Sequence, residues 1–311
     1  MKTLICLFVV LGYAFSLPSS IDWSKVKPNL ASLDPVKNIS HPSARIIGGN
    51  EAEPNSRPFQ VALARDDSNQ FCSGLLISAD WVLTAAHCMV GASRVFVILG
   101  AHRILQVEPS QVVIISRDII LHPDFDPATL KNDIALMRLS QSVAFNDVIQ
   151  PVDLPSTLSG TFAGSSAVLS GWGQLTQSHI SLARTLQILP LRVITNIACA
   201  RTYGISSISL SVMCTSGYDC VIDNVDHRIR LGKIWDDMEL TAGSCSAAKN
   251  TWDCTCNVGG CNGDGGSPLT VKNKLVGITS FISSQGCEAG SPTGYTRVSF
   301  YRRWIRQTTG V

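Results

Sequence analysis

Residues 83–88 read Leu-Thr-Ala-Ala-His-Cys, which places a histidine directly before a cysteine at the end of an apolar segment. Cys72 lies sixteen residues before Cys88, so a disulfide could close a loop around the histidine. Residues 132–136, Asn-Asp-Ile-Ala-Leu, put a carboxylate where another apolar segment begins. Residues 261–268, Cys-Asn-Gly-Asp-Gly-Gly-Ser-Pro, form a glycine-rich turn with an acid. Each stretch alone has an ordinary structural explanation, but the three in this order indicate a chemical site.

The composition bounds the remaining possibilities. The chain has 311 residues, of which 45% are hydrophobic and 15% charged, with a net charge of +2. A sizeable core is therefore expected, extensive disorder is excluded, and nothing suggests a partner such as nucleic acid. The eleven cysteines fit an oxidising compartment, a metal protein or a redox enzyme.

The N-terminus predicts secretion. Lys2 precedes an apolar run over residues 4–15, and Ala14-Phe15-Ser16 supplies small residues at alternate positions. This pattern is typical of a signal peptide spanning residues 1–16. The alternative, a membrane anchor, would need about twenty apolar residues, so we expect no membrane association. Loss of Cys6 with the signal peptide would leave ten cysteines.

Residues 17–45 are rich in Pro, Ser, Asn and Lys and show little periodicity, which predicts a processed segment outside the core. Asn38-Ile39-Ser40 within it is an acceptor sequence for N-linked sugar. The segment ends in Arg45, which precedes Ile-Ile-Gly-Gly-Asn at residues 46–50. After residue 46 the chain is β-rich, with short strands expected at 59–63, 95–99 and 112–115. A terminal helix is expected from one apolar face comprising Phe300, Tyr301, Trp304 and Ile305.

These motifs together resemble the chymotrypsin-like serine proteases over nearly all of residues 46–311. The resemblance rests on the start at Ile46, on the segments around His87 and Asp133, and on three further motifs. These are Ser-Gly-Trp-Gly at 170–173, Thr-Ser-Phe at 279–281 and the final Trp-Ile at 304–305. Leu-Gly-Ala-His at 99–102, Val-Ile-Thr-Asn at 193–196 and Gly-Cys-Glu-Ala-Gly at 286–290 are similar to the arthropod brachyurins, or collagenase-like chymotrypsins.

The resemblance implies an all-β fold of two antiparallel Greek-key β-barrels with a C-terminal helix. The barrels are expected at about 46–165 and 166–311, with the cleft between them and residues 17–45 as a propeptide. The resemblance also implies that a trypsin-like protease cleaves after Arg45. The new amine of Ile46 would then pair with Asp264, a zymogen switch in which a buried carboxylate gains a partner.

The same resemblance assigns the site. His87 is expected to be the base, Asp133 to orient it, and Ser280 to support that carboxylate. The N–H groups of Gly263 and Gly265 would form the oxyanion hole. Where the family has its nucleophilic serine directly after the aspartate, this chain has Gly265.

Ser267 carries the turn's hydroxyl, two residues beyond the nucleophile position. Two residues of extended chain span roughly 6–7 Å, whereas a nucleophile must come within about 3 Å of the histidine. We therefore expect Ser267 to be a poor substitute and the chain as written to be a very weak peptidase or none.

Six cysteines match the family's disulfides: Cys72 with Cys88, Cys199 with Cys214, and Cys261 with Cys287. Four others lie in or beside an atypical insert at about 218–253: Cys220, Cys245, Cys254 and Cys256. Three interpretations remain open for this insert. It is a disulfide-braced surface loop, a metal site that includes His227, or a gene-model error such as a translated intron. No metal or cofactor is expected.

The expected specificity pocket comprises Gly259, Ser280, Phe281 and Ile282. With no acid at Gly259, a trypsin-like preference is not expected, and the branched Ile282 would hinder large aromatic residues.

Two functions therefore remain. One is a secreted, catalytically impaired pseudoenzyme of the serine endopeptidase family. It would be monomeric and extracellular, for example in a gut lumen, and would bind peptides, protease inhibitors or other proteases. The other is an active digestive endopeptidase whose sequence is misrecorded around 218–267.

Overall fold

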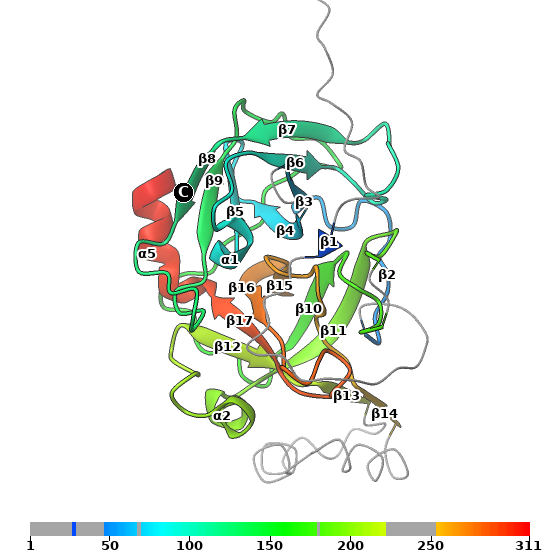
Figure 1. Cartoon of the computed structure of the whole chain (residues 1–311), viewed down its shortest axis with the longest axis vertical. Coiled ribbons are helices and arrows are strands. Elements are labelled where there is room, and N and C mark those ends of the chain that lie inside the picture. The colour runs from blue at the N-terminus through cyan, green and yellow to red at the C-terminus, as the bar shows by residue number, and fades with distance from the viewer. Residues whose placement is uncertain (1–26, 29–46, 67–69, 179–180, 222–252) are drawn as a thin grey trace, which may run out of the picture.

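The structure is a computed structural model that describes residues 27–28, 47–66, 70–178, 181–221 and 253–311. Two curved β-sheets lie against each other, and the C-terminal helix packs at one side (Figure 1). The expected signal peptide, Asn38, Arg45 and Ile46 lie outside the described residues.

The first barrel is built from strands in the order β7-β6-β3-β4-β5-β9-β8, all neighbours antiparallel. Their bounds are β3 Gln60–Arg65, β4 Gln70–Leu76, β5 Trp81–Thr84, β6 Val95–Leu99, β7 Val112–Ser116, β8 Asp118–Leu121 and β9 Ala135–Arg138. A single residue, Arg117, separates β7 from β8, so one bent strand spans both ends of this order and closes the sheet.

The second barrel follows the order β10-β15-β16-β17-β12-β11-β2, and β10 also pairs with β11. The bounds are β2 Asn50–Glu51, β10 Ser166–Gly171, β11 Gln187–Ile194, β12 Val212–Thr215, β15 Pro268–Val271, β16 Lys274–Phe281 and β17 Thr293–Arg297. The β10–β11 pairing closes the sheet on itself. β2 lies in the sequence range expected for the first barrel but pairs with β11 of the second, so the start of the domain reaches across the molecule.

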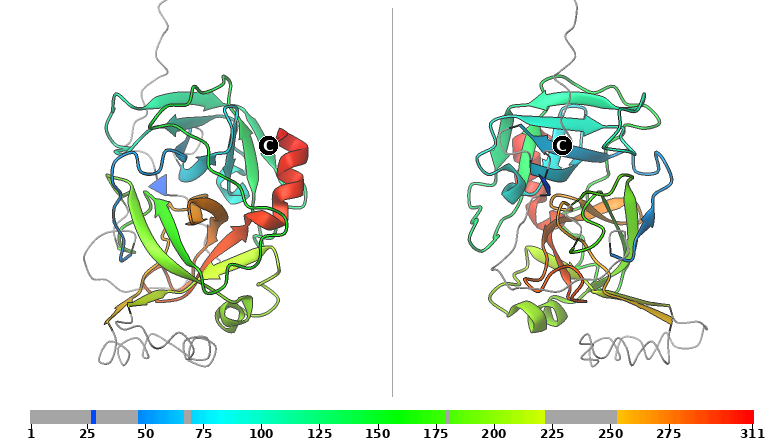
Figure 2. Two further views of the ribbon diagram at one scale, coloured as in Figure 1. Left: turned by 180° about the vertical axis from the view of Figure 1, so that it is seen from behind. Right: turned by 45° about the vertical axis from the view of Figure 1, so that its right-hand side comes forward.

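A two-stranded ribbon projects from the second barrel at the lower edge of the molecule, where its first strand lies against β11 (Figures 1 and 2). It consists of β13 (Tyr218–Val221) and β14 (Asp253–Cys256), whose register places Cys220 opposite Cys254. These strands are the two ends of the atypical insert. His227 and Cys245, invoked for a metal site there, lie outside the described residues.

The C-terminal helix packs on the barrel that precedes it in the chain by more than a hundred residues. The C-terminal helix α5 (Val298–Thr309) follows the second barrel, yet its buried Tyr301 and Ile305 join the core of the first. Trp304 packs partly buried against that core, whereas Phe300 is 56% exposed because adjacent helical positions face directions about 100° apart. The expected apolar face is thus correct for three of its four residues. The two-barrel fold with a terminal helix is confirmed.

Candidate active site

His87 and Asp133 lie together where the first barrel meets the second. His87 lies in α1 (Ala86–Met89), a single helical turn that follows β5. Its backbone N–H donates to Oδ1 of Asp133 at 2.8 Å, and its Nδ1 lies 2.7 Å from Oδ2. Asp133 is 1% exposed. A carboxylate held this way favours the tautomer with hydrogen on Nδ1, which leaves Nε2 as the proton acceptor.

Asp133 is itself held by residues of the second barrel. The hydroxyl of Ser280 donates to Oδ2, and the hydroxyl of Thr296 donates to the Asp133 carbonyl at 2.7 Å. Both donors are buried. Because β16 and β17 supply these two groups, the second barrel fixes the acid that the first barrel contributes.

The residue before the acid explains how the chain turns into β9. Asn132 has a φ of 56°, a left-handed conformation that asparagine tolerates better than most residues. Its Oδ1 accepts from the hydroxyl of Tyr301 at 2.8 Å, and its Nδ2 donates to the Asp124 carbonyl at 2.7 Å. The C-terminal helix therefore helps to set the position of Asp133.

The glycine-rich turn reaches the cleft from the second barrel and is fixed by backbone hydrogen bonds. The N–H of Ser73 donates to the Gly265 carbonyl at 2.8 Å, and the N–H of Gly266 donates to the Thr279 carbonyl at 2.9 Å. Gly266 has a φ of 79°, and a Cβ atom there would overlap the Ser73 carbonyl. This glycine is required by the close approach of β4. Within the described residues, the N–H groups of Gly263 and Gly265 have no acceptor.

Gly265 lies directly beneath the imidazole of His87. A Cβ atom placed on Gly265 by standard geometry would lie 2.6 Å from Nε2 and 3.2 Å from Sγ of Cys88. Gly265 is not among the glycines of positive φ, so its backbone conformation is open to other residues. The geometry places residue 265, and not its neighbours, where a nucleophile for His87 would stand.

The hydroxyl of Ser267 lies on the Gly171 side of the turn. Ser267 is fully buried, and its Oγ would lie 2.6 Å from a Cβ atom placed on Gly171 of β10, on the side where the Asp264 carboxylate lies. Its Oγ makes no hydrogen bond to any described residue. In this conformation the hydroxyl is not paired with Nε2 of His87.

Asp264 is enclosed by the same turn and by the segment after β10. Its Oδ1 accepts from the N–H of Gly173 and its Oδ2 from the N–H of Cys261, both at 2.9 Å. Side chains at Gly171 or Gly173 would overlap this carboxylate. Burial raises the pKa of Asp264 to about 6, although these two N–H donors oppose the shift.

Ile47 lies against the same region. Its carbonyl accepts from the N–H of Gly259 at 3.3 Å, which places the residue after the expected new N-terminus beside the 258–264 segment.

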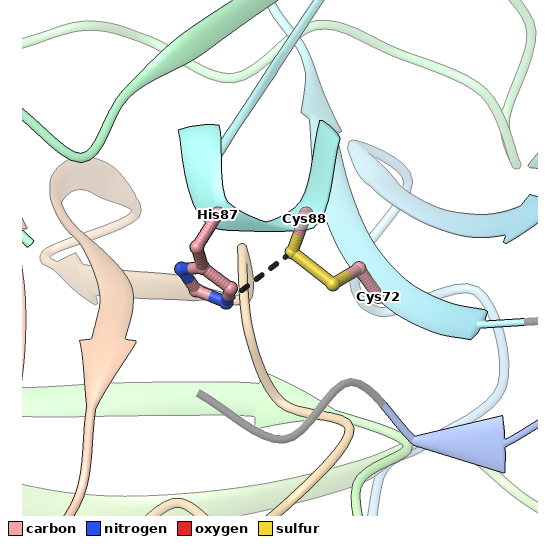
Figure 3. Close-up of side chains that lie close together, drawn as sticks. All are labelled: Cys72, His87 and Cys88. Carbon is pink, nitrogen blue, oxygen red and sulfur yellow. Dashed lines mark hydrogen bonds between the residues drawn. A yellow bond between two sulfur atoms is a disulfide. The ribbon is translucent and has the colours of Figure 1, made fainter. Parts of the chain in front are cut away.

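The disulfides agree with the family pairing: Cys72–Cys88, Cys199–Cys214 and Cys261–Cys287. Figure 3 shows Cys72–Cys88 beside His87, with Sγ of Cys88 3.5 Å from Nε2. Although Cys72, His87 and Cys88 cluster as metal ligands would, both sulfurs are already bonded to each other and offer no thiolate. This cluster therefore does not suit a metal ion.

The expected specificity pocket is lined by buried residues. Gly259 is buried, and a Cβ atom on it would lie 2.7 Å from Oγ1 of Thr293. The ring of Phe281 packs over Gly294, where any side chain would overlap it, and Tyr203 meets this ring edge-on at 5.2 Å. Ile282 is half-buried.

Several contributors to the site escaped the sequence analysis. Thr296 and Tyr301 act through long-range contacts with residues 132–133, and no local motif indicated them. Gly171 and Gly173 were noted as part of a family motif, but their role in enclosing Asp264 follows only from the contacts.

A histidine–aspartate pair facing a glycine-rich turn across two β-barrels defines the class of two-barrel serine proteases. The family model described as Trypsin matches residues 46–223 and 239–305. The chain is 38% identical to brachyurin of Leptuca pugilator over 86% of this chain and 99% of that protein. It is 35% identical to collagenase of Hypoderma lineatum over 86% and 88% of the two chains. The solved structure of HL collagenase superposes with a TM-score of 0.65 at 33% identity, covering 85% of this chain and 99% of that one.

The chain belongs to the trypsin family of serine proteases. Members of this family act on protein or peptide substrates. Among the described residues, no helix is both long and apolar enough to cross a membrane.

Proposed function

We propose that the chain as written is a secreted serine-protease homologue that binds extended polypeptide in its cleft and does not cleave it effectively. The observation that carries this proposal is that glycine stands at residue 265, whose Cβ position would lie 2.6 Å from Nε2 of His87, so the residue beside the histidine carries no hydroxyl of its own. A histidine base needs a hydroxyl within hydrogen-bond reach to generate the acyl-enzyme.

The loss of turnover caused by a missing nucleophile is too large for the remaining residues of the site to offset. Removing the nucleophile of a serine protease of unrelated fold lowers turnover about a millionfold. The N–H groups of Gly263 and Gly265 remain available to hold a carbonyl oxygen, and His87 remains oriented by Asp133. The retained parts support binding of a peptide carbonyl without covalent chemistry.

We further propose that secretion and activation follow the family scheme. Cleavage after Arg45 would give Ile46 an ammonium group, which the buried Asp264 carboxylate would favour as a partner. The raised pKa of Asp264 and the position of Ile47 beside Gly259 support this route. The extracellular partners would be peptides, protease inhibitors or other proteases, and the protein would act as a monomer.

Peptide hydrolysis by trypsin-activated protein tests the proposal. The wild type should cleave a mixed peptide library at background rate, whereas Gly265→Ser should gain turnover at a non-tryptic preference, since Gly259 and Ile282 supply no acid. Ser267→Ala is the matched control and should equal the wild type. Turnover by the wild type that disappears in Ser267→Ala would overturn the proposal.

A second candidate is an active endopeptidase whose sequence is misrecorded around 218–267. Two observations favour it. The family model leaves out residues 224–238, inside the atypical insert, and the backbone at Gly265 is one that serine can adopt. Sequencing the transcript across residues 210–275 separates the two. A serine codon after Asp264 without the insert would establish the second candidate, and the present reading would exclude it.

A further inference from the structure

A short strand from the segment before the cleavage site lies on the edge of the first barrel. Strand β1 (Lys27–Pro28) pairs in parallel with β4, with Lys27 opposite Gln70 and Pro28 opposite Phe71. Figure 1 shows β1 between the two barrels, and its partner Phe71 directly precedes Cys72, whose disulfide partner Cys88 follows His87. Part of the expected propeptide therefore lies at the cleft and not away from it.

The pairing uses the edge of β4 that faces the catalytic turn. β4 pairs with β3 from Phe71 to Leu75, but with β5 only at Leu75 and Leu76. Ser73 directs its N–H to the Gly265 carbonyl and its carbonyl to the Thr84 hydroxyl. Since these partners lie on the side away from β3, the outer edge of β4 borders the turn.

Backbone groups alternate in direction along a strand, so Phe71 presents its N–H and carbonyl on the same edge as Ser73. Phe71 is two residues from Ser73, about 6–7 Å along the strand. The segment paired with Phe71 is therefore next to the point where Ser73 holds Gly265. A polypeptide running along this edge toward Gly265 would meet Lys27 and Pro28 in its way.

We infer that residues 27–28 are an autoinhibitory strand, which occupies the cleft-facing edge of β4 until the chain is cleaved after Arg45. This inference rests on the proposed function, since it concerns access of extended polypeptide to the same cleft. Addition of a strand to an open sheet edge is a general mode of peptide binding. Proline on the added strand has no N–H, so β1 is a poor template for a further strand.

Because β1 pairs with β4 through only two residues, we expect it to leave β4 once the chain is cleaved after Arg45. Tethering to the barrel gives the segment an effective concentration of the order of mM, which sustains even a weak two-residue pairing. No cysteine lies between residues 17 and 45, so no disulfide retains the segment after cleavage. Cleavage thus changes occupancy of the edge without any rearrangement of β4.

Hydrogen exchange in the wild-type protein, with Gly265 in place, tests the inference without catalysis. The β4 fragment covering residues 70–76 is followed in uncleaved protein and after trypsin cleavage and gel filtration. We expect exchange of the Phe71 amide, on the β1-facing edge of this fragment, to accelerate about tenfold after cleavage, while β6 is unchanged. Replacing residues 26–29 by Gly-Ser-Gly-Ser should give the fast exchange before cleavage, and the same replacement at 32–35 should not.

Synthetic peptide 17–45 at mM concentration should restore the slow exchange of cleaved protein. Equal exchange of residues 70–76 in uncleaved, cleaved and 26–29-replaced protein would overturn the inference. Since exchange is read on the inactive chain, catalysis by the wild type would overturn the proposed function while leaving this result intact. Conversely, an inactive wild type with unchanged exchange would overturn only the autoinhibitory strand.

Discussion

The imidazole of His87 lies over Gly265, with Nε2 2.6 Å from where a Cβ atom of residue 265 would stand. The ring thus occupies space that a serine side chain would need, so the ring or the turn must shift before a serine fits. The backbone places no demand for glycine at this position. Gly265 therefore differs in kind from its neighbour Gly266, whose conformation and contacts both require glycine.

Alanine substitutions at the two glycines should differ in stability. Gly265→Ala should stay within about 1 kcal/mol of the wild type, because the imidazole can move and the unfolded chain loses entropy. Gly266→Ala should cost at least about 2 kcal/mol, because it adds left-handed strain to a clash with the Ser73 carbonyl. Urea unfolding of both variants measures the two losses of stability, and equal losses would contradict the claim that only residue 266 requires glycine.

The pH dependence of stability should report Asp264 in the uncleaved protein. Its folded pKa of about 6 exceeds its ordinary value of 3.8, so the folded state binds the proton more tightly. Stability from this group is fully present below about pH 4 and is lost as the pH rises through 6, a change of about 3 kcal/mol. Urea unfolding of the wild type and of Asp264→Asn at pH 4 and pH 7 isolates the contribution of Asp264 to this pH dependence. Identical pH slopes would contradict the assignment.

Removing the Ser280 hydroxyl should destabilise the fold through Asp133. Ser280→Ala leaves a buried carboxylate without one of its donors, at an expected cost of about 1–3 kcal/mol. Ser73→Ala is the matched control, since the buried Ser73 Oγ has no hydrogen-bond partner within the described residues and should be lost at little cost. If thermal unfolding ranks the two variants equally, the support of Asp133 by Ser280 is not energetically significant.

The Cys72–Cys88 disulfide should stabilise the first barrel and hold His87 in position, because Cys88 follows His87 in α1. It closes a loop across a sequence separation of 16 residues, for which the expected contribution is about 3 kcal/mol. The double substitution of both cysteines by alanine should lower the urea midpoint accordingly. In the Gly265→Ser background it should also lower turnover, because α1 carries His87 next to Cys88. A stable double variant with unchanged turnover would show that α1 is held by other contacts.

The sequence predicted those features that local patterns carry. The strand expected at 95–99 has the observed bounds, and that at 112–115 is short by one residue, because alternation and β-branched content are local properties. His87 and Asp133 were found from family motifs, and the structure brings them together. The pairing of β1 with β4 was not predicted, since Lys27–Pro28 has no strand pattern and depends on an open edge elsewhere.

The central claim is that Gly265 removes the nucleophile and that Ser267 does not replace it. Its most direct test is the intact mass of trypsin-activated wild-type protein after exposure to a fluorophosphonate, with Gly265→Ser beside it. We predict no adduct on the wild type and one phosphonyl group per molecule on Gly265→Ser. A stoichiometric adduct on the wild-type chain, mapped to Ser267 or to any other residue, would contradict the account.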